Sequence, residues 1–336
     1  MLRYASALLL LAAVAGCMDS APHDNPFDPA SENFDDEGAI MGSVRGIYPS
    51  TPGREGVRIR VMPLDGQGTE RVATTDAMGS FTITRVPTVP TSEYVVVAEG
   101  DGLRTETDTI TVQAGLTARA DFGLDALPEI LTQNARTVHI ERWVAPTTLF
   151  QLEVEAIVTD SDRATDVNGV ELVVDDIGFR AALTQVAPGH YEGKFDAEML
   201  PGGQVQAFLG RPLRVEVTDV NGNVGTGAPM TLVRVVEQTP LTASPQGTET
   251  ITDPSPSLVW RPAQIPFPFT YRVDLYHVDG AGIPRLIESE SGIDSSVTSY
   301  DVERVLGEGN YYWTVWLVDG AGNRSRSKEA GFSVGP

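Results

Sequence analysis

Short alternating strands separated by turn residues are the feature that most constrains this chain of 336 residues. In residues 57–62, for example, Val57, Ile59 and Val61 alternate with Arg58, Arg60 and Met62. Similar segments recur from Gly38 onward, divided by Gly, Pro, Asp and Asn, and none sustains the apolar period of a helix. Turn signals about eight to twelve residues apart are typical of β-sandwiches. The sequence therefore predicts an all-β protein.

An internal repeat indicates how the strands are divided among domains. The segment Asp219-Val220-Asn221-Gly222-Asn223 recurs 100 residues later as Asp319-Gly320-Ala321-Gly322-Asn323, and an apolar strand precedes each copy. This offset is about the length of one immunoglobulin-like sandwich, so the copies are expected to be equivalent hairpins of tandem domains. We predict a signal peptide in residues 1–16 and a tether in residues 17–38. Three tandem β-sandwiches are predicted in residues 39–126, 127–238 and 239–336.

The first predicted sandwich resembles the carboxypeptidase regulatory-like family, which implies a transthyretin-like fold. One departure from the family pattern is Glu93, where a glycine usually precedes the tyrosine. The resemblance rests on turn and core residues, namely Gly42-Ser43-Val44, Gly56-Val57, Thr75-Asp76, Gly79-Ser80-Phe81, Tyr94 and Asp121-Phe122-Gly123-Leu124.

The second predicted sandwich looks like a bacterial immunoglobulin-like domain, and the third is similar to fibronectin type III. In the third, Leu258-Val259-Trp260 and Tyr311-Tyr312-Trp313 carry the resemblance. It implies that Trp260 is the core tryptophan and that Tyr311 is the tyrosine at a strand corner.

The N-terminus predicts export. Arg3 precedes an apolar run from Ala5 to Val14, which is too short to span a bilayer, and small residues follow it. Val14-Ala15-Gly16-Cys17 resembles the lipobox of bacterial lipoproteins, which implies that Cys17 is acylated and anchors the chain to a membrane. The alternative is an ordinary cleaved signal that happens to end near a cysteine. In some bacterial lipoproteins an aspartate directly after the acylated cysteine resembles an inner-membrane retention signal. This chain has Met18 at that position, which favours the outer membrane.

Charge and missing motifs narrow the function classes. The formal net charge of −22 disfavours nucleic acid and anionic lipid as partners, and residues 18–38, which contain no Lys or Arg, are predicted to be an extended acidic tether. If Cys17 is acylated, no thiol remains for catalysis, disulfides or metal binding, because Cys17 is the only cysteine. The sequence has no zinc-protease, serine-hydrolase or P-loop motif. We therefore expect no enzymatic activity, no catalytic residues and no cofactor, apart from the calcium considered next.

Oxygen ligands from two loops suggest a calcium site in the second domain. If the immunoglobulin topology holds, the loop after one strand and a later hairpin meet at the same end of the sandwich. Such hard ligands suit Ca²⁺, although the spacing is not that of an EF-hand, and Asp and Asn are also the ordinary residues of turns. The candidate ligands are Asp160, Asp162, Asp166, Asp219, Asn221 and Asn223.

Aromatic residues in the third domain suggest a second site. If Tyr311, Trp313 and Val315 face the core, then Tyr312 and Trp316 point outward. Tyr276 on a neighbouring strand would join them in a platform for a sugar ring or a partner's edge. The alternative is ordinary cross-strand packing or burial against the second domain.

Together these features predict a lipid-anchored, non-enzymatic protein of a bacterial envelope. Its sandwiches would face the periplasm or the cell exterior and serve protein binding or scaffolding. A glycan-binding surface lipoprotein is the alternative, discriminated by the aromatic platform of Tyr276, Tyr312 and Trp316.

Overall fold

The structure is a computed structural model that describes residue 31 and residues 36–89, 92–163, 165–247 and 249–336. The predicted signal peptide, Cys17 and most of the tether lie outside the described residues. Strands β1 to β26 and four short 3-10 helices make up the regular structure of the described part, so the all-β prediction is confirmed. No helix in that part is long and apolar enough to cross a membrane. The chain divides into two compact units, Met1–Asp125 and Ala126–Pro336.

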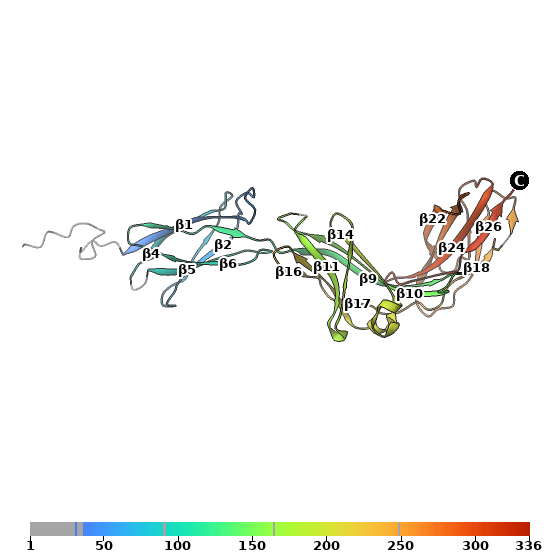
Figure 1. The fold of residues 1–336 in the computed structure, drawn as a ribbon, viewed down its shortest axis with the longest axis horizontal. Helices are drawn as coiled ribbons and strands as arrows, with labels where there is room; N and C mark the ends of the chain where they lie inside the picture. Colours follow the sequence, from blue (N-terminus) through green and yellow to red (C-terminus); the bar gives the residue numbers. More distant parts are fainter. Residues whose placement is uncertain (1–30, 32–35, 90–91, 164, 248) are drawn as a thin grey trace, which may run out of the picture. The chain divides into compact units, whose positions relative to one another are not determined.

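The first unit is a sandwich of two four-stranded sheets (Figure 1). In one sheet, β1 lies between β4 and the short strands β7 and β8, and the other has the order β3-β2-β5-β6. The alternating residues Val57, Ile59 and Val61 are fully buried between the sheets, as their period of two predicts. The strands are β1 (Glu37–Gly46), β2 (Arg58–Pro63), β3 (Arg71–Thr74), β4 (Ser80–Pro87), β5 (Glu93–Glu99), β6 (Glu106–Thr111), β7 (Thr117–Arg119) and β8 (Phe122–Leu124).

The residues that carried the family resemblance contact one another in this sandwich. A Cβ at Gly42 would lie 1.6 Å from the carbonyl oxygen of Ala120, so only glycine lets β1 approach the segment between β7 and β8 this closely. The next residue, Ser43, donates from its backbone N–H and its hydroxyl to Asp121 Oδ1, at 2.9 and 2.8 Å. The buried Thr75 hydroxyl accepts from the N–H of Val57 at 2.9 Å. The motif therefore fixes strand contacts and turns.

The second unit contains a second sandwich that begins with two long strands, β9 (Glu129–Glu141) and β10 (Thr148–Thr159). One of its sheets has the order β12-β11-β15-β16, with β17 also on β15, and β13-β14-β10-β9 form the facing layer. Phe208, Leu213 and Leu172 are fully buried between the layers. The remaining elements are β11 (Val167–Val174), η1 (Asp175–Ile177), β12 (Phe179–Ala182), β13 (Thr184–Ala187), β14 (His190–Asp196), η2 (Ala197–Met199), η3 (Pro201–Gly203), η4 (Val205–Phe208), β15 (Pro212–Asp219), β16 (Val224–Thr226) and β17 (Met230–Thr231).

A third sandwich with a core of its own follows in the same unit. Trp260 is buried and packs against Tyr271, with ring centroids 5.3 Å apart. The Tyr311 hydroxyl donates to the carbonyl of Gly307 at 2.9 Å, so both the core and the corner prediction are confirmed. The strands are β18 (Leu241–Ser244), β19 (Thr250–Ile251), β20 (Ser257–Arg261), β21 (Phe269–Val278), β22 (Pro284–Asp294), β23 (Ser299–Asp301), β24 (Gly309–Asp319), β25 (Arg324–Arg326) and β26 (Ala330–Val334).

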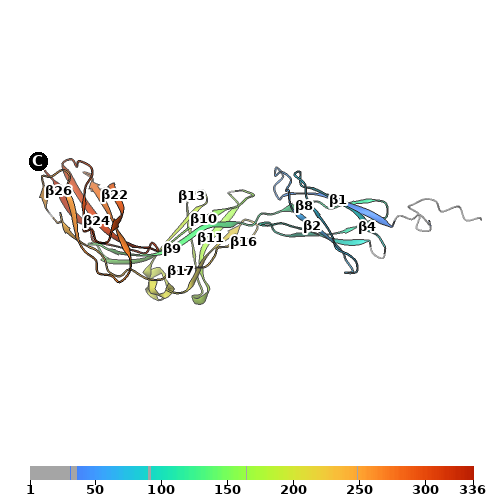
Figure 2. The same cartoon turned by 180° about the vertical axis from the view of Figure 1, so that it is seen from behind.

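One sheet joins the second and third sandwiches. Its order is β13-β14-β10-β9-β25-β24-β21-β22, so β9 of the second sandwich pairs directly with β25 of the third. The pairing is parallel, with Arg324, Ser325 and Arg326 opposite Val138, His139 and Ile140. Figures 1 and 2 both show β9 and β10 reaching towards β24. The two predicted tandem domains thus keep separate cores but share a sheet, which the sequence did not predict.

Candidate functional site

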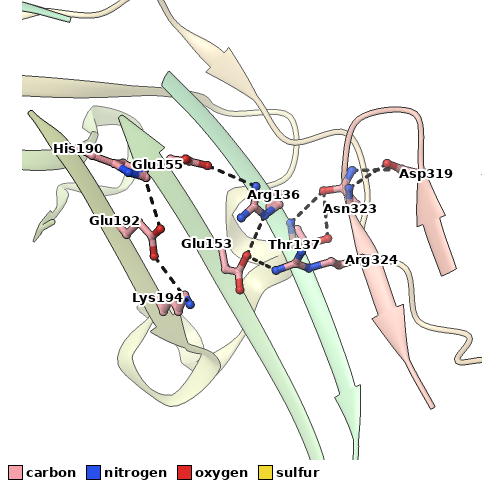
Figure 3. A network of polar contacts seen from close by, with 10 residues as sticks. All are labelled: Arg136, Thr137, Glu153, Glu155, His190, Glu192, Lys194, Asp319, Asn323 and Arg324. Atoms are coloured by element: carbon pink, nitrogen blue, oxygen red, sulfur yellow. Dashed lines mark hydrogen bonds and ion pairs between the residues drawn. The ribbon is translucent and has the colours of Figure 1, made fainter. Parts of the chain in front are cut away.

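The junction between β9 and β25 is built around the buried carboxylate of Glu153 on β10 (Figure 3). Arg136 of β9 donates to Glu153 Oε2 at 2.8 Å, and Arg324 of β25 donates to the same oxygen at 2.6 Å. The two arginines come from different sandwiches, so one carboxylate holds both. Burial alone would raise the pKa of Glu153, but its hydrogen bonds and the charges of Arg136 and Arg324 outweigh burial and hold the pKa below the usual value.

Asn323 links the same two strands through a second polar contact. It is buried, and its Oδ1 accepts from the backbone N–H of Thr137 at 2.9 Å and from the Thr137 hydroxyl at 3.2 Å. Its Nδ2 donates to Asp319 Oδ2 at 3.1 Å. A buried N–H left without an acceptor costs about 1–3 kcal/mol, so Asn323 is important to the junction.

Residues 234–238, which connect the second and third sandwiches, make polar contacts to β9 and β25 at every second residue. The single proton of the Thr137 hydroxyl is shared between Asn323 Oδ1 and the carbonyl of Arg234, which is 3.1 Å away, and His139 Nδ1 lies 3.2 Å from the carbonyl of Val236. The Ser325 hydroxyl donates to the carbonyl of Gln238 at 2.6 Å. Residues 234–238 are thus held by side chains of both β9 and β25, which leaves this connection little freedom to bend.

The repeated hairpin that relates the two sandwiches is held by one aspartate in each copy. Asp219 Oδ1 accepts from the N–H groups of Asn221 and Asn223 at 2.9 and 2.8 Å, and Asp319 Oδ1 accepts from Ala321 and Asn323 at 2.8 and 2.9 Å. Gly222 and Gly322 occupy the turn position with positive φ, at 85° and 84°. The equivalence predicted from the 100-residue offset therefore extends to individual hydrogen bonds.

This hairpin explains part of the predicted calcium set. The Asn223 side chain donates to Asp219 Oδ2 at 2.7 Å, so both carboxylate oxygens of Asp219 already accept hydrogen bonds within the turn. The structure instead gathers Asp160, Asp162 and Asp166, each with a carboxylate oxygen within 4.8 Å of the others. The two loops do lie together, because the N–H of Val220 donates to the carbonyl of Asp166 at 2.8 Å.

A second cluster of potential metal ligands in the described part consists of Glu155, His190 and Glu192 (Figure 3). His190 Nε2 lies 2.8 Å from Glu155 and 3.7 Å from Glu192. Glu155 also pairs with Arg136, and Glu192 with Lys194, at 3.7 and 3.9 Å. All three side chains are half-buried and their carboxylates have cationic neighbours, so this cluster forms a surface ion-pair network.

The predicted aromatic residues lie on one face of the third sandwich. Tyr276 and Tyr312 are opposite each other on β21 and β24, and their rings stack with centroids 4.6 Å apart. Trp316 is half-buried, its Nε1 donates to Asp274 Oδ2 at 2.8 Å, and the guanidinium of Arg324 lies 5.1 Å from its ring centroid. The structure thus pairs the two tyrosines by cross-strand packing, whereas Trp316 contacts polar and cationic side chains.

Sequence reasoning missed Trp143, which follows β9 and is 68% exposed. Its Nε1 donates to the carbonyl of Glu329 at 2.7 Å, and the ammonium of Lys328 lies 4.5 Å from its ring centroid. A cavity of about 530 Å³ beside the ring is lined by Trp143, Thr242, Gln246, Gly247, Tyr312, Glu329, Ala330 and Gly331. The sequence does contain one indication of this site. Trp143 and Val144 are adjacent in a turn, where large apolar side chains have no core to enter.

This combination of an exposed indole and polar side chains suits the binding of a sugar ring. An aromatic ring packs against the apolar face of the sugar, while Gln246, Glu329 and Thr242 offer donors and acceptors for hydroxyl groups. Among the described residues that line the cavity there is no histidine.

Comparison with solved structures shows only general similarity. The Bacillus anthracis TIE protein is 10% identical, with 89% of this chain and 49% of that chain covered and a TM-score of 0.28. This chain thus spans about half of the length of that protein. The FN1–FN3 domains of chicken CNTN1 are 10% identical, with 89% and 98% covered and a TM-score of 0.32. The fibronectin(III)-like modules of CbhA from Clostridium thermocellum are 17% identical, with 62% and 93% covered and a TM-score of 0.29.

The comparison with protein families gives a specific result for the first sandwich. No curated protein matches the chain. The carboxypeptidase regulatory-like family resemblance predicted from Gly42, Thr75 and Asp121 is confirmed by a match to that family's model. Domains of this type are non-catalytic. The match to the carboxypeptidase regulatory-like domain covers residues 40–125 of this chain.

Proposed function

We propose that this chain is a lipid-anchored, non-enzymatic protein of the bacterial cell envelope. Its β-sandwich domains bind partners at a distance from the membrane. The observation that carries the proposal is the sheet shared by the second and third sandwiches. The Glu153 and Asn323 contacts join two binding-type modules into one arm. A stiff arm presents loops and sheet edges in a fixed arrangement, which lowers the entropy cost of binding a partner.

The N-terminal sequence supports attachment of this arm to a membrane. A signal-like segment precedes Cys17, and the acidic residues that follow suit an extended spacer. One acyl chain binds membranes only marginally, whereas two chains give stable anchoring. We also propose that the protein is localised at the cell envelope, and at the outer membrane in particular.

Replacement of Cys17 tests the anchor. In the native host, the wild-type chain should fractionate with membranes and incorporate labelled fatty acid. The Cys17→Ser variant should lose the label and move to the soluble fraction, and Met18→Ala should behave as wild type. Unlabelled wild-type chain in the soluble fraction would contradict lipid anchoring. Protease treatment of intact cells, with a periplasmic control protein, would then distinguish surface exposure from a periplasmic location.

A glycan-binding role is the second candidate function, and the cavity beside Trp143 favours it. Removal of an indole that stacks on a sugar costs about 1–3 kcal/mol, which is about 5- to 150-fold in affinity. In a glycan array followed by calorimetry, Trp143→Ala should therefore lose binding. The matched control is Val144→Ala, since Val144 is the neighbouring residue and is 75% exposed. Equal binding by both variants, or no glycan bound by the wild type, would reject this role.

A further inference from the structure

Three carboxylates from one loop converge at one end of the second sandwich. Asp160 directly follows β10, Asp166 directly precedes β11, and Asp162 lies between them. One oxygen of each lies within 4.8 Å of the other two. Two oxygens that are each about 2.4 Å from one ion can be at most about 4.8 Å apart, so this spacing fits a single coordination sphere.

Two of these carboxylates are buried and have an oxygen without a protein partner. Asp160 is 6% exposed and Asp166 is 4% exposed, and the Oδ2 atom of each is buried and accepts no hydrogen bond. A buried ionised oxygen without a partner is costly, and the cost disappears when the oxygen binds a cation. The two orphaned oxygens therefore point to a positively charged ligand.

The remaining contacts hold the three carboxylates in place. Asp160 Oδ1 accepts from the N–H of Asp162 at 2.9 Å, and Asp162 Oδ2 accepts from the N–H of Ala126 at 2.7 Å. The Asp166 carbonyl accepts from Val220 in the neighbouring hairpin at 2.8 Å. Burial raises the pKa of Asp160, and the charges of Asp162, Asp166 and Asp219 raise it further. The loop is thus organised around concentrated negative charge.

We propose that Asp160, Asp162 and Asp166 bind one Ca²⁺ ion. Carboxylate oxygens are hard ligands, and the cluster contains no thiol or imidazole that would favour zinc or copper. Calcium accepts six to eight oxygens in flexible geometry, so water can complete the sphere, whereas Mg²⁺ requires a nearly ideal octahedron. Asp219 adds negative charge nearby, while its own oxygens and the Asn223 amide stay in the hairpin. The site is independent of the shared sheet and of the proposed function.

Calcium titration of the purified, chelator-treated full chain tests the proposal. Calorimetry should detect one site per chain, with an affinity in the range of extracellular calcium modules, about 10⁻⁴–10⁻³ M. Calcium at about 100 times the dissociation constant should raise the melting temperature of the transition that contains the second sandwich by about 5 °C or more. Mg²⁺ at equal concentration should give less than half of that shift. Absence of both heat and shift with Ca²⁺ would overturn the proposal.

Isosteric variants locate the site and separate binding from folding. The double variant Asp160→Asn, Asp166→Asn should lose the calorimetric signal and the calcium-dependent shift. Without calcium it should melt no lower than wild type, because it lacks the two uncompensated charges. Asp162→Asn, at a less buried position, should weaken binding about tenfold with an unchanged circular dichroism spectrum. The control Glu192→Gln, in the other cluster, should bind as wild type. Undiminished binding by the double variant would refute the assignment.

Discussion

At the scale of single residues, Glu153 is the most consequential side chain of the junction, because two arginines from different sandwiches donate to one of its oxygens. A buried charge that loses its partners is strongly destabilising, by about 3–5 kcal/mol, whereas exposed ion pairs contribute about 0–1 kcal/mol. Arg136 and Arg324 therefore depend on Glu153 far more than Lys194 depends on Glu192.

The lowered pKa of Glu153 predicts a specific acid sensitivity. Its pKa is below the ordinary value of 4.5 in the folded chain, so its stabilising effect is complete above pH 4.5 and is lost as the pH falls through the folded pKa. In urea unfolding from pH 7 to pH 3, Glu153→Gln should be less stable than wild type by about 3 kcal/mol at pH 7 and should converge with it at low pH.

Glu192→Gln is the matched control for this prediction. Its half-buried carboxylate lies 3.9 Å from Lys194, so the change should cost less than about 1 kcal/mol at any pH. A constant difference between Glu153→Gln and wild type across the pH range would show that the charge of Glu153 does not stabilise the junction.

At the scale of elements, the two copies of the Asp-x-x-Gly-Asn hairpin give an internal comparison. Asn223 and Asn323 each donate from Nδ2 to the aspartate at the start of their own turn. Asn323 Oδ1 also accepts from the backbone N–H and the hydroxyl of Thr137 on β9. Both positions therefore share the hydrogen bond within the turn, and Asn323 in addition makes a contact between the sandwiches.

Alanine at the two positions should have unequal effects. Asn223→Ala removes the side-chain hydrogen bond to Asp219 within the turn and should cost about 1 kcal/mol. Asn323→Ala also leaves the Thr137 N–H without its acceptor and should cost about 1–3 kcal/mol more. Denaturant unfolding measures both, and hydrogen exchange at Thr137 should accelerate only in Asn323→Ala. Equal costs and unchanged exchange would mean that the junction does not rely on Asn323.

Most strands could be predicted from the sequence, but β9 could not. The apolar alternation of residues 57–62 reports burial on one face, which is the signal that strand prediction uses. In contrast, β9 contains Gln133, Arg136 and His139, because its neighbours at the junction are polar. Its pairing partner β25 lies about 190 residues away, and no local pattern encodes a parallel contact over that distance.

The candidate sites were predictable to different degrees. Asp160, Asp162 and Asp166 are close in sequence, so their convergence follows from one loop, whereas the commitment of Asp219 to its own turn appears only in the hydrogen bonds. The outward positions of Tyr276 and Tyr312 follow from strand alternation. The cavity beside Trp143 combines the β9–β10 turn with residues about 100 and 190 positions later, which only the tertiary structure brings together.

At the scale of the whole molecule, the second unit is organised as one arm from two sandwich cores. Its shared sheet, the double ion pair at Glu153 and the fixed residues 234–238 all oppose bending between the sandwiches. Tandem domains that move relative to each other usually make few contacts across the boundary between them. The proposed function, which is to present loops and sheet edges in a fixed arrangement, requires that the connection between the two sandwiches does not bend.

Distance measurement between the two sandwiches tests the rigid arm most directly. Spin labels on Lys194→Cys and Leu286→Cys, in a full chain that also carries Cys17→Ser, would occupy one exposed position on each sandwich. Pulsed electron spectroscopy should give a single narrow distance distribution, and Asn323→Ala should broaden it while Asn223→Ala leaves it unchanged. A broad or multimodal distribution in the chain with both asparagines intact would contradict the rigid arm.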